Sequence, residues 1–243
     1  MVCDLDIVRK GTVINMKTKI AFLIAAGIMA INTACLAEGY FKDLEGNKNK
    51  AIIEHLAEKG IIEGKTANIF SPKDNVTRAE FSKMVCKAMG YTEYSNVNSF
   101  GDVSENDWFA SFVNILAEKG IIEGYNGNFY PNDFIKNEEA AKILVELYEK
   151  ETIGIRYQGT YASFIPDYFD ASPWARDYVN KGVMIGAVRS LEYPVDIDNP
   201  NTAKRTDVAK FRPKEFMKRD EAAEVIFNVT NAISVTNKYE EVE

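Results

Sequence analysis

Apolar residues recur along this chain at the spacing that places them on one face of a helix. The positions between them are mostly polar or charged, as expected for helices that bury one face and expose the other. The predicted buried positions are Ile52, Ile53, Leu56, Ala57, Phe81, Met84, Val85, Ala88, Met89, Ala140, Ile143, Leu144, Leu147, Ala222, Val225, Ile226 and Val229. These stripes predict a helical core and no cofactor.

Glycines mark the ends of two of these helices. If Gly60 is the first residue beyond its helix, Ile61 and Leu56 are the pair that touches in a Schellman cap. The same arrangement recurs at Gly120, Ile121 and Leu116. Helix capping therefore explains much of the repeated Gly-Ile-Ile sequence.

A second set of helices has a start signal at residues 77–80. Thr77 and Glu80 have the spacing of a capping box, in which each side chain bonds the backbone N–H of the other residue. Val76 and Phe81 complete a hydrophobic staple across this start. A helix is therefore predicted to begin directly after Thr77.

The chain contains an internal repeat. Residues 57–64 recur without change at 117–124, and Phe-x-Pro follows at 70–72, 129–131 and 211–213. Residues 174–186 align with 108–120 at the same Trp-to-Gly spacing. The sequence therefore predicts three units, each with a helix, a loop and a second helix.

A single helix pair of this kind cannot bury its apolar faces, so the three units are expected to pack as one all-α domain. The predicted organisation is repeat 1 at 38–95, repeat 2 at 96–150, a connecting loop at 151–168, repeat 3 at 169–235 with a loop insertion at 189–210, and an acidic tail at 236–243.

The N-terminal residues predict export. Two lysines precede an apolar run at 20–31, and small residues follow at Cys35 and Ala37, which is the pattern of a secretory signal peptide. Translation is expected to start at Met16, and residues 1–37 are expected to be absent from the mature chain. An uncleaved membrane anchor and a lipoprotein with lipid on Cys35 are the alternatives.

Charge and composition exclude several classes of function. The chain has 29 basic and 36 acidic side chains. Because nucleic acids and anionic membranes select for basic surfaces, neither is predicted as a partner. Cys86 is the one cysteine beyond the predicted signal peptide and is expected in the core. His55 is the one histidine, so neither a zinc site nor a histidine-based triad is predicted.

Several motifs together resemble the S-layer homology repeat in order and spacing. They are Phe-x-Asp at 41–43 and 100–102, Trp-Ala at 174–175, Gly-Ile-Ile-x-Gly, Phe-x-Pro, and Thr-Arg-Ala-Glu at 77–80. The resemblance extends from Phe41 to about Ala232. It implies a pseudo-threefold helical domain that binds secondary cell-wall polymers, commonly pyruvylated polysaccharides, in grooves between neighbouring repeats.

Within that resemblance, Arg78 and Arg219 are the predicted anion-binding residues. An arginine at the first turn of a helix offers a carboxylate two N–H donors beside free backbone amides and the positive end of the helix dipole. Asn137 takes this place in repeat 2. The alternative is that Arg78 is only an exposed residue at the start of a capped helix. Because Thr77 and Glu80 would still form the cap, Arg78→Ala is expected to weaken wall binding and to leave the fold nearly unchanged.

Trp108 and Trp174 are the predicted sugar-stacking residues, with Lys48 at the matching place in repeat 1. The alternative is that both rings fill the core between helices. Asp43 and Asp102 resemble the early acidic residue of the family and are expected either to accept from sugar hydroxyls or to cap the next helix.

The resulting prediction is a secreted, non-enzymatic protein of the cell envelope and cell-wall surface, of the S-layer type. It needs no cofactor, has no membrane span in the mature chain, and attaches non-covalently to cell-wall polysaccharide or peptidoglycan. Other S-layer or surface proteins are a second class of partner. The alternative function is an adaptor or structural subunit that keeps the fold but binds proteins.

Overall fold

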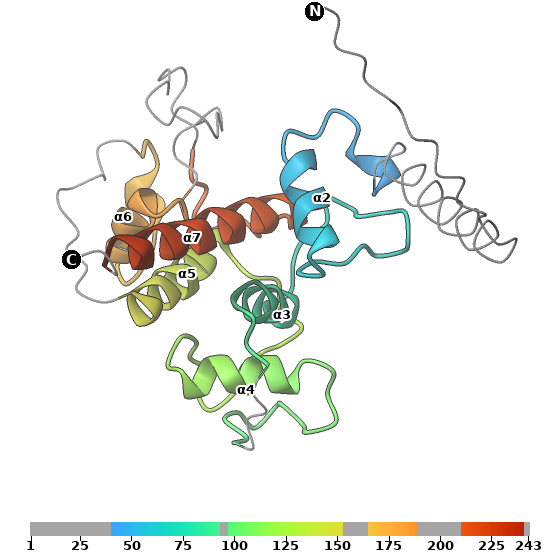
Figure 1. Ribbon diagram of the computed structural model, residues 1–243. Coiled ribbons are helices and arrows are strands. Elements are labelled where there is room, and N and C mark those ends of the chain that lie inside the picture. The colour runs from blue at the N-terminus through green and yellow to red at the C-terminus, as the bar shows by residue number, and fades with distance from the viewer. Residues whose placement is uncertain (1–39, 93–96, 153–164, 189–209, 241–243) are drawn as a thin grey trace, which may run out of the picture.

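The computed structural model describes residues 40–92, 97–152, 165–188 and 210–240. Over these ranges the chain forms helices and no sheet, which confirms the predicted all-α class (Figure 1). The predicted signal peptide and nearly all of the 189–210 insertion lie outside the described residues. The elements are η1 (Lys42–Leu44), α2 (Lys50–Glu58), α3 (Arg78–Met89), α4 (Ala110–Glu118), α5 (Asn137–Glu151), η3 (Tyr168–Asp170), α6 (Arg176–Met184) and α7 (Arg219–Glu240).

The predicted capping signals are present. Thr77 Oγ1 accepts from Glu80 N at 3.2 Å, and Glu80 Oε2 accepts from Thr77 N at 2.9 Å. At the end of α2, Ile61 N donates to Leu56 O at 2.9 Å across Gly60, whose φ is +68°. This is the Schellman pattern, so local signals correctly placed both helix ends.

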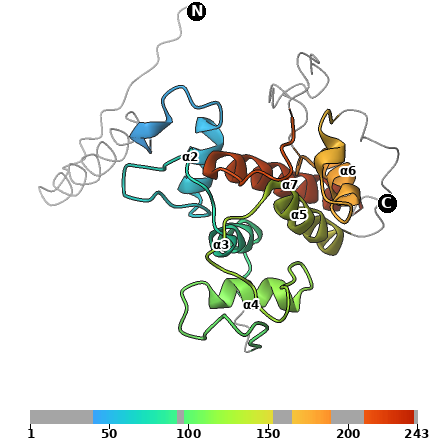
Figure 2. The ribbon, with the colours of Figure 1, turned by 180° about the vertical axis from the view of Figure 1, so that it is seen from behind.

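The helices pair across the predicted repeats. α2 packs against α7, α4 against α3, and α6 against α5, while α7 also contacts both α3 and α5. In Figure 1, α7 extends across the molecule from α2 to α6, and α4 lies on the side of α3 away from α7; the reverse view in Figure 2 agrees. The first helix of each unit therefore packs mainly on the second helix of another unit.

Three loop residues join the starts of α3, α5 and α7. Val76 N donates to Met217 O at 3.0 Å, Met217 N to Ile135 O at 2.9 Å, and Ile135 N to Val76 O at 3.0 Å. All three side chains are buried. These hydrogen bonds form a closed cycle through equivalent positions of the three predicted units.

The core contains the predicted apolar stripes almost entirely, together with Cys86. Burial raises the pKa of the Cys86 thiol to about 12.

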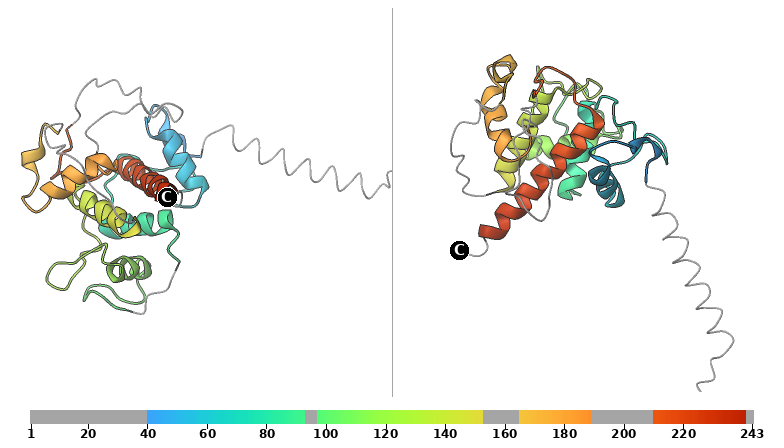
Figure 3. Two further views of the ribbon diagram at one scale, coloured as in Figure 1. Left: turned by 60° about the vertical axis from the view of Figure 1, so that its left-hand side comes forward. Right: turned by 90° about the horizontal axis from the view of Figure 1, so that it is seen from above.

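One boundary was wrong: α7 continues to Glu240, so most of the predicted tail at 236–243 is helical. The C-terminal end of α7 projects beyond the other helices (Figure 3, right). Among the described helices, none combines the length and apolarity required of a membrane span.

Candidate functional site

Each Phe-x-Pro loop is held by an aspartate that precedes the first helix of the same unit. Asp43 accepts from Phe70 N at 2.9 Å and Ser71 N at 2.7 Å, one bond to each carboxylate oxygen. The middle residue of the loop needs this support, because Ser71 has a φ of +59°, a conformation that is costly for residues other than glycine.

Asp102 holds the second loop in the same way, accepting from the backbone N–H groups of Phe129 and Tyr130, both at 2.7 Å. The prediction that Asp43 and Asp102 cap the following helix is therefore wrong. Their place in sugar binding stays a prediction, but both oxygens of each carboxylate already accept loop amides. These aspartates shape the loops that border the site.

Sequence reasoning missed the third member of this set, Asp167. It accepts from Phe211 N at 2.9 Å and Arg212 N at 2.7 Å. The available signal was an apolar residue two positions before an aspartate, shortly before Trp174, as in the other units. The long separation between Asp167 and its loop concealed the match.

Arg78 joins the start of α3 to the Phe-x-Pro loop of the next unit. Its Nε donates to Phe129 O at 2.9 Å, and its guanidinium carbon lies 4.7 Å from the centre of the Phe129 ring. The side chain is 16 % exposed. The alternative of an exposed helix-start residue is therefore wrong, and Arg78→Ala cannot be expected to leave the fold unchanged.

Arg219, from the third predicted unit, repeats this geometry with the loop of the first. Its Nε donates to Phe70 O at 2.9 Å, Nη2 donates to Glu63 O at 2.7 Å, and the guanidinium carbon lies 4.6 Å from the Phe70 ring centre. Burial lowers the pKa of Arg78 and of Arg219, yet an arginine keeps its charge at neutral pH. The two predicted anion-binding residues therefore occupy equivalent positions, in which Arg219 is buried and Arg78 is partly buried.

Asn137 keeps one part of this arrangement and lacks the other. Its Nδ2 donates to Phe211 O at 3.3 Å and to Arg212 O at 2.9 Å, so it also joins a helix start to the next loop. It supplies no positive charge. The arginine position thus has two separable roles, a loop contact that asparagine can make and a cation that it cannot provide.

The helix-start amides beside these arginines are already used. Arg78 N donates to Asp133 O at 2.9 Å, Ala79 N to Pro131 O at 3.0 Å, and Glu80 N to Thr77. The expectation of free amides next to Arg78 was therefore wrong, because neighbouring loops supply acceptors. Anion binding here must depend on side-chain donors.

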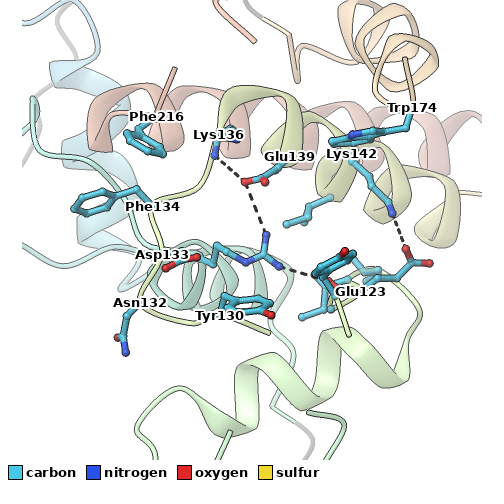
Figure 4. Close-up of a pocket in the computed structure, with 16 residues that line it drawn as sticks. Glu123, Tyr130, Asn132, Asp133, Phe134, Lys136, Glu139, Lys142, Trp174 and Phe216 are labelled. Atoms are coloured by element: carbon cyan, nitrogen blue, oxygen red, sulfur yellow. Dashed lines mark hydrogen bonds and ion pairs between the residues drawn. The ribbon is translucent and has the colours of Figure 1, made fainter. Parts of the chain in front are cut away.

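Arg78 lies in a pocket with a cavity volume of about 890 Å³, here named the Arg78 pocket. Three predicted units contribute to it: Arg78 from the first, residues 121–125 (Ile-Ile-Glu-Gly-Tyr) from the second, and Trp174 from the third. Figure 4 shows Trp174 and Lys142 at one end, Phe134 and Phe216 at the other, and Glu139 between them.

A second pocket, of about 230 Å³, surrounds Arg219 and is named the Arg219 pocket. Each of its lining residues corresponds to a residue of the Arg78 pocket. Residues 61–65 correspond to 121–125, Glu80 to Glu139, Lys83 to Lys142, Met84 to Ile143, Trp108 to Trp174, and Arg219 to Arg78. The structure thus brings the predicted residues together as two Arg and Trp pairs.

Both tryptophans are surface residues. Trp108 is 57 % exposed and Trp174 is 50 % exposed, so the alternative that they fill the core is wrong. Lys83 Nζ lies 5.8 Å from the Trp108 ring centre, within the range of a cation–π contact. Each pocket therefore has an accessible aromatic face at its edge.

Ion pairs hold a lysine beside each arginine. Lys83 lies 3.0 Å from Glu63, and Lys142 lies 2.7 Å from Glu123. Hydrogen bonds from Lys87 and Lys83 lower the pKa of Glu63 to about 2. The glutamates of the repeated segments therefore position cationic groups at both pockets.

Comparison with known families decides the nature of these units. The S-layer homology domain matches residues 40–82 and 99–141. Two segments of the chain are thus similar to the S-layer homology domain. They cover most of the first two predicted repeats, and the third repeat stays a prediction.

Relatives of these S-layer homology domains include surface proteins and enzymes. The chain is 32 % identical to exoglucanase XynX of Acetivibrio thermocellus over 189 residues, which is 78 % of this chain and 16 % of the relative. It is 29 % identical to the surface-layer 125 kDa protein of Lysinibacillus sphaericus over 184 residues, 75 % of this chain and 15 % of the relative. It is 30 % identical to S-layer protein sap of Bacillus anthracis over 135 residues, 55 % of this chain and 16 % of the relative.

The chain therefore spans less than a fifth of the length of each of these three relatives. The S-layer homology domains and the surface-layer relatives point to localisation at the cell surface.

Proposed function

We propose that this chain attaches non-covalently to an acidic cell-wall polymer, and that the Arg78 and Arg219 pockets are its binding sites. The observation that supports this most directly is that two equivalent pockets each contain an arginine held against a loop and a half-exposed tryptophan. The ligand class is a pyruvylated secondary cell-wall polysaccharide or a modified peptidoglycan. The chain itself performs no catalytic step in this proposal.

The chemistry of each pocket suits a sugar that carries a carboxylate. A guanidinium has five N–H donors, and Nε is committed to a loop carbonyl. Nη2 also donates to a backbone carbonyl, that of Glu123 for Arg78 and that of Glu63 for Arg219. The other N–H groups are held in place by these bonds and by the ring beneath, so little side-chain entropy is lost when an anion binds. The tryptophan at the pocket edge supplies an apolar face for the C–H side of a sugar.

The third place in the cycle is not proposed as an equivalent site. Asn137 stands there in place of arginine, and Lys48 stands in place of tryptophan. A polymer residue would meet neither a guanidinium fork nor an aromatic face from these positions. We therefore assign binding to two pockets and propose residues 169–235 as a third repeat that completes the Arg78 pocket through Trp174.

Substitution by asparagine tests the arginines with little disturbance of the fold, because Asn137 already makes the loop contact at this position. The assay is sedimentation of the full chain with purified, protein-free cell wall. Loss of a charge-assisted hydrogen bond costs about 1.5–3 kcal/mol, so Arg78→Asn should weaken binding in its pocket about tenfold or more. Arg78→Asn combined with Arg219→Asn should bring binding close to background.

The tryptophans provide an independent test. Trp174→Ala and Trp108→Ala should each weaken sedimentation with the wall, since each removes the aromatic face of one pocket. Phe169→Ala is the matched control, because Phe169 is 77 % exposed and lines neither pocket. If the double arginine variant sediments like the parent and keeps the parent's circular dichroism spectrum, wall binding through these pockets is wrong.

The absence of arginine and tryptophan from the third place favours one alternative, a surface adaptor that binds proteins. In that case the purified chain would remain in the supernatant with protein-free wall and would sediment only after a surface-protein fraction is added.

A further inference from the structure

The Arg78 and Arg219 pockets share their lining but differ in size. Their volumes are about 890 and 230 Å³, and pockets that hold small molecules commonly measure about 300–1,000 Å³. The additional lining of the Arg78 pocket includes Tyr130, Phe134 and Phe216. The difference in size therefore arises largely at one aromatic end of the Arg78 pocket.

Polar residues stand at two of the three matching places near the Arg219 pocket. Ser71 is the counterpart of Tyr130, and Asn75 is the counterpart of Phe134. Asn75 Oδ1 accepts from Lys218 Nζ at 2.6 Å. Lys65, the counterpart of a tyrosine in the larger pocket, pairs with Glu80 at 2.8 Å. These polar contacts replace the open aromatic end.

The aromatic end is a fixed surface. The Phe134 and Phe216 ring centroids lie 5.6 Å apart with an interplanar angle of 59°, and each side chain is 45 % exposed. Backbone bridges of Phe134 to Thr77 and of Phe216 to Lys136 hold both residues beside the closed cycle of hydrogen bonds. Packing of the core does not explain why two adjacent rings are held half exposed at this place.

The position of these rings indicates which class of ligand binds on them. They are continuous with the Arg78 pocket and lie at the end opposite Trp174 (Figure 4). Polar side chains of Asn132, Asp133 and Lys136 line the same region. A surface of aromatic faces mixed with hydrogen-bonding groups suits a sugar, which presents C–H faces and hydroxyls together.

We infer that the Arg78 pocket binds at least two consecutive sugar units of the wall polymer, one at Arg78 and Trp174 and the next on Phe134 and Phe216. The Arg219 pocket lacks this second position and binds a single unit. This inference rests on the proposed wall attachment and adds that the two pockets bind segments of different length from the same polymer.

The test uses oligosaccharides released from purified, protein-free wall and separated by length, with binding measured by calorimetry. The full chain carries Arg219→Asn, so that the Arg78 pocket is observed alone. Long fragments should bind about tenfold more tightly than the shortest ones, as expected if one additional ring contact is made. Phe134→Asn with Phe216→Asn should remove this dependence on length, and Phe169→Asn should preserve it.

The outcomes separate this inference from the proposed function. If long and short fragments bind equally, or if the double phenylalanine variant keeps the parent's dependence on length, the second sugar position is wrong while wall attachment stands. In that case the exposed rings serve a different partner. If the full chain binds neither the wall nor any fragment, the proposed function fails, and the second sugar position fails with it.

Discussion

Replacing Arg78 by alanine removes the side chain that joins the start of α3 to the loop of the next unit. The lost contacts are the 2.9 Å hydrogen bond to Phe129 O and the position of the guanidinium over the Phe129 ring. A hydrogen bond from a charged group contributes about 1.5–3 kcal/mol, and a cation–π contact about 0.5–2 kcal/mol. Because the two contacts share one side chain, we expect a combined loss of about 2–4 kcal/mol in the free energy of unfolding.

Arg78→Asn should recover part of that loss. Asn137 shows that an amide at this position reaches the carbonyls of the next loop, and a neutral hydrogen bond contributes about 0.5–1.5 kcal/mol. The expected order of stability is therefore parent, then Arg78→Asn, then Arg78→Ala, with about 1 kcal/mol between the variants.

Urea unfolding followed by far-ultraviolet circular dichroism measures this order. Lys59→Ala is the control, because Lys59 is exposed at the end of α2, and surface changes of this kind alter stability by less than about 0.5 kcal/mol. The reasoning is refuted if Arg78→Ala unfolds as the control does, or if the asparagine variant is no more stable than the alanine variant.

Three further predictions follow from the loops, the ion pairs and the core. Asp102→Ala removes the acceptor of two loop amides and should lower the free energy of unfolding by about 2–4 kcal/mol, with the exposed Glu105→Ala as its control in urea unfolding. Because the pKa of Glu63 is lowered from 4.5 to about 2, its stabilising effect should be complete above about pH 4.5 and lost as pH falls through about 2. Melting of Glu63→Gln and the parent should therefore converge near pH 2. Cys86, whose thiol pKa is about 12, should resist iodoacetamide at pH 8 in the native chain and react in denaturant; rapid native labelling would contradict its burial.

The sequence predicted the local features of the fold well. The capping box at Thr77, the Schellman cap at Gly60 and the apolar stripes all depend on residues a few positions apart, which a linear pattern records directly. Pairing of helices across units depends instead on where long loops lead. The apolar stripe of α2 is equally compatible with packing on α3 of its own unit and on the second helix of another unit. Periodicity alone therefore could not predict that α2 packs on α7.

The sequence predicted which residues belong to the site but not how they are arranged. Arg78 and Trp174 were chosen separately, and only folding reveals that residues from different units form one pocket. The amides next to Arg78 were expected to be free because their acceptors, carbonyls of 131 and 133, come from another loop. Burial of the arginines could not be predicted either, since the Phe129 ring beneath Arg78 lies far away in sequence.

The pairing of α2 with α7 has a consequence for the order in which the chain can fold. Asn49 Nδ2, just before α2, donates to Asp220 O at 3.0 Å and to Glu224 Oε2 at 2.8 Å, across more than 170 residues of sequence. In a linear array each repeat stacks on a neighbour that is already made, so folding can proceed from one end. Here the main helical partner of α2 among the described residues is α7, which is available only after nearly the whole chain has been synthesised. Such long-range closure slows folding and exposes apolar faces meanwhile. A chain shortened by α7 should therefore lose the order of its first unit and not merely that of its last.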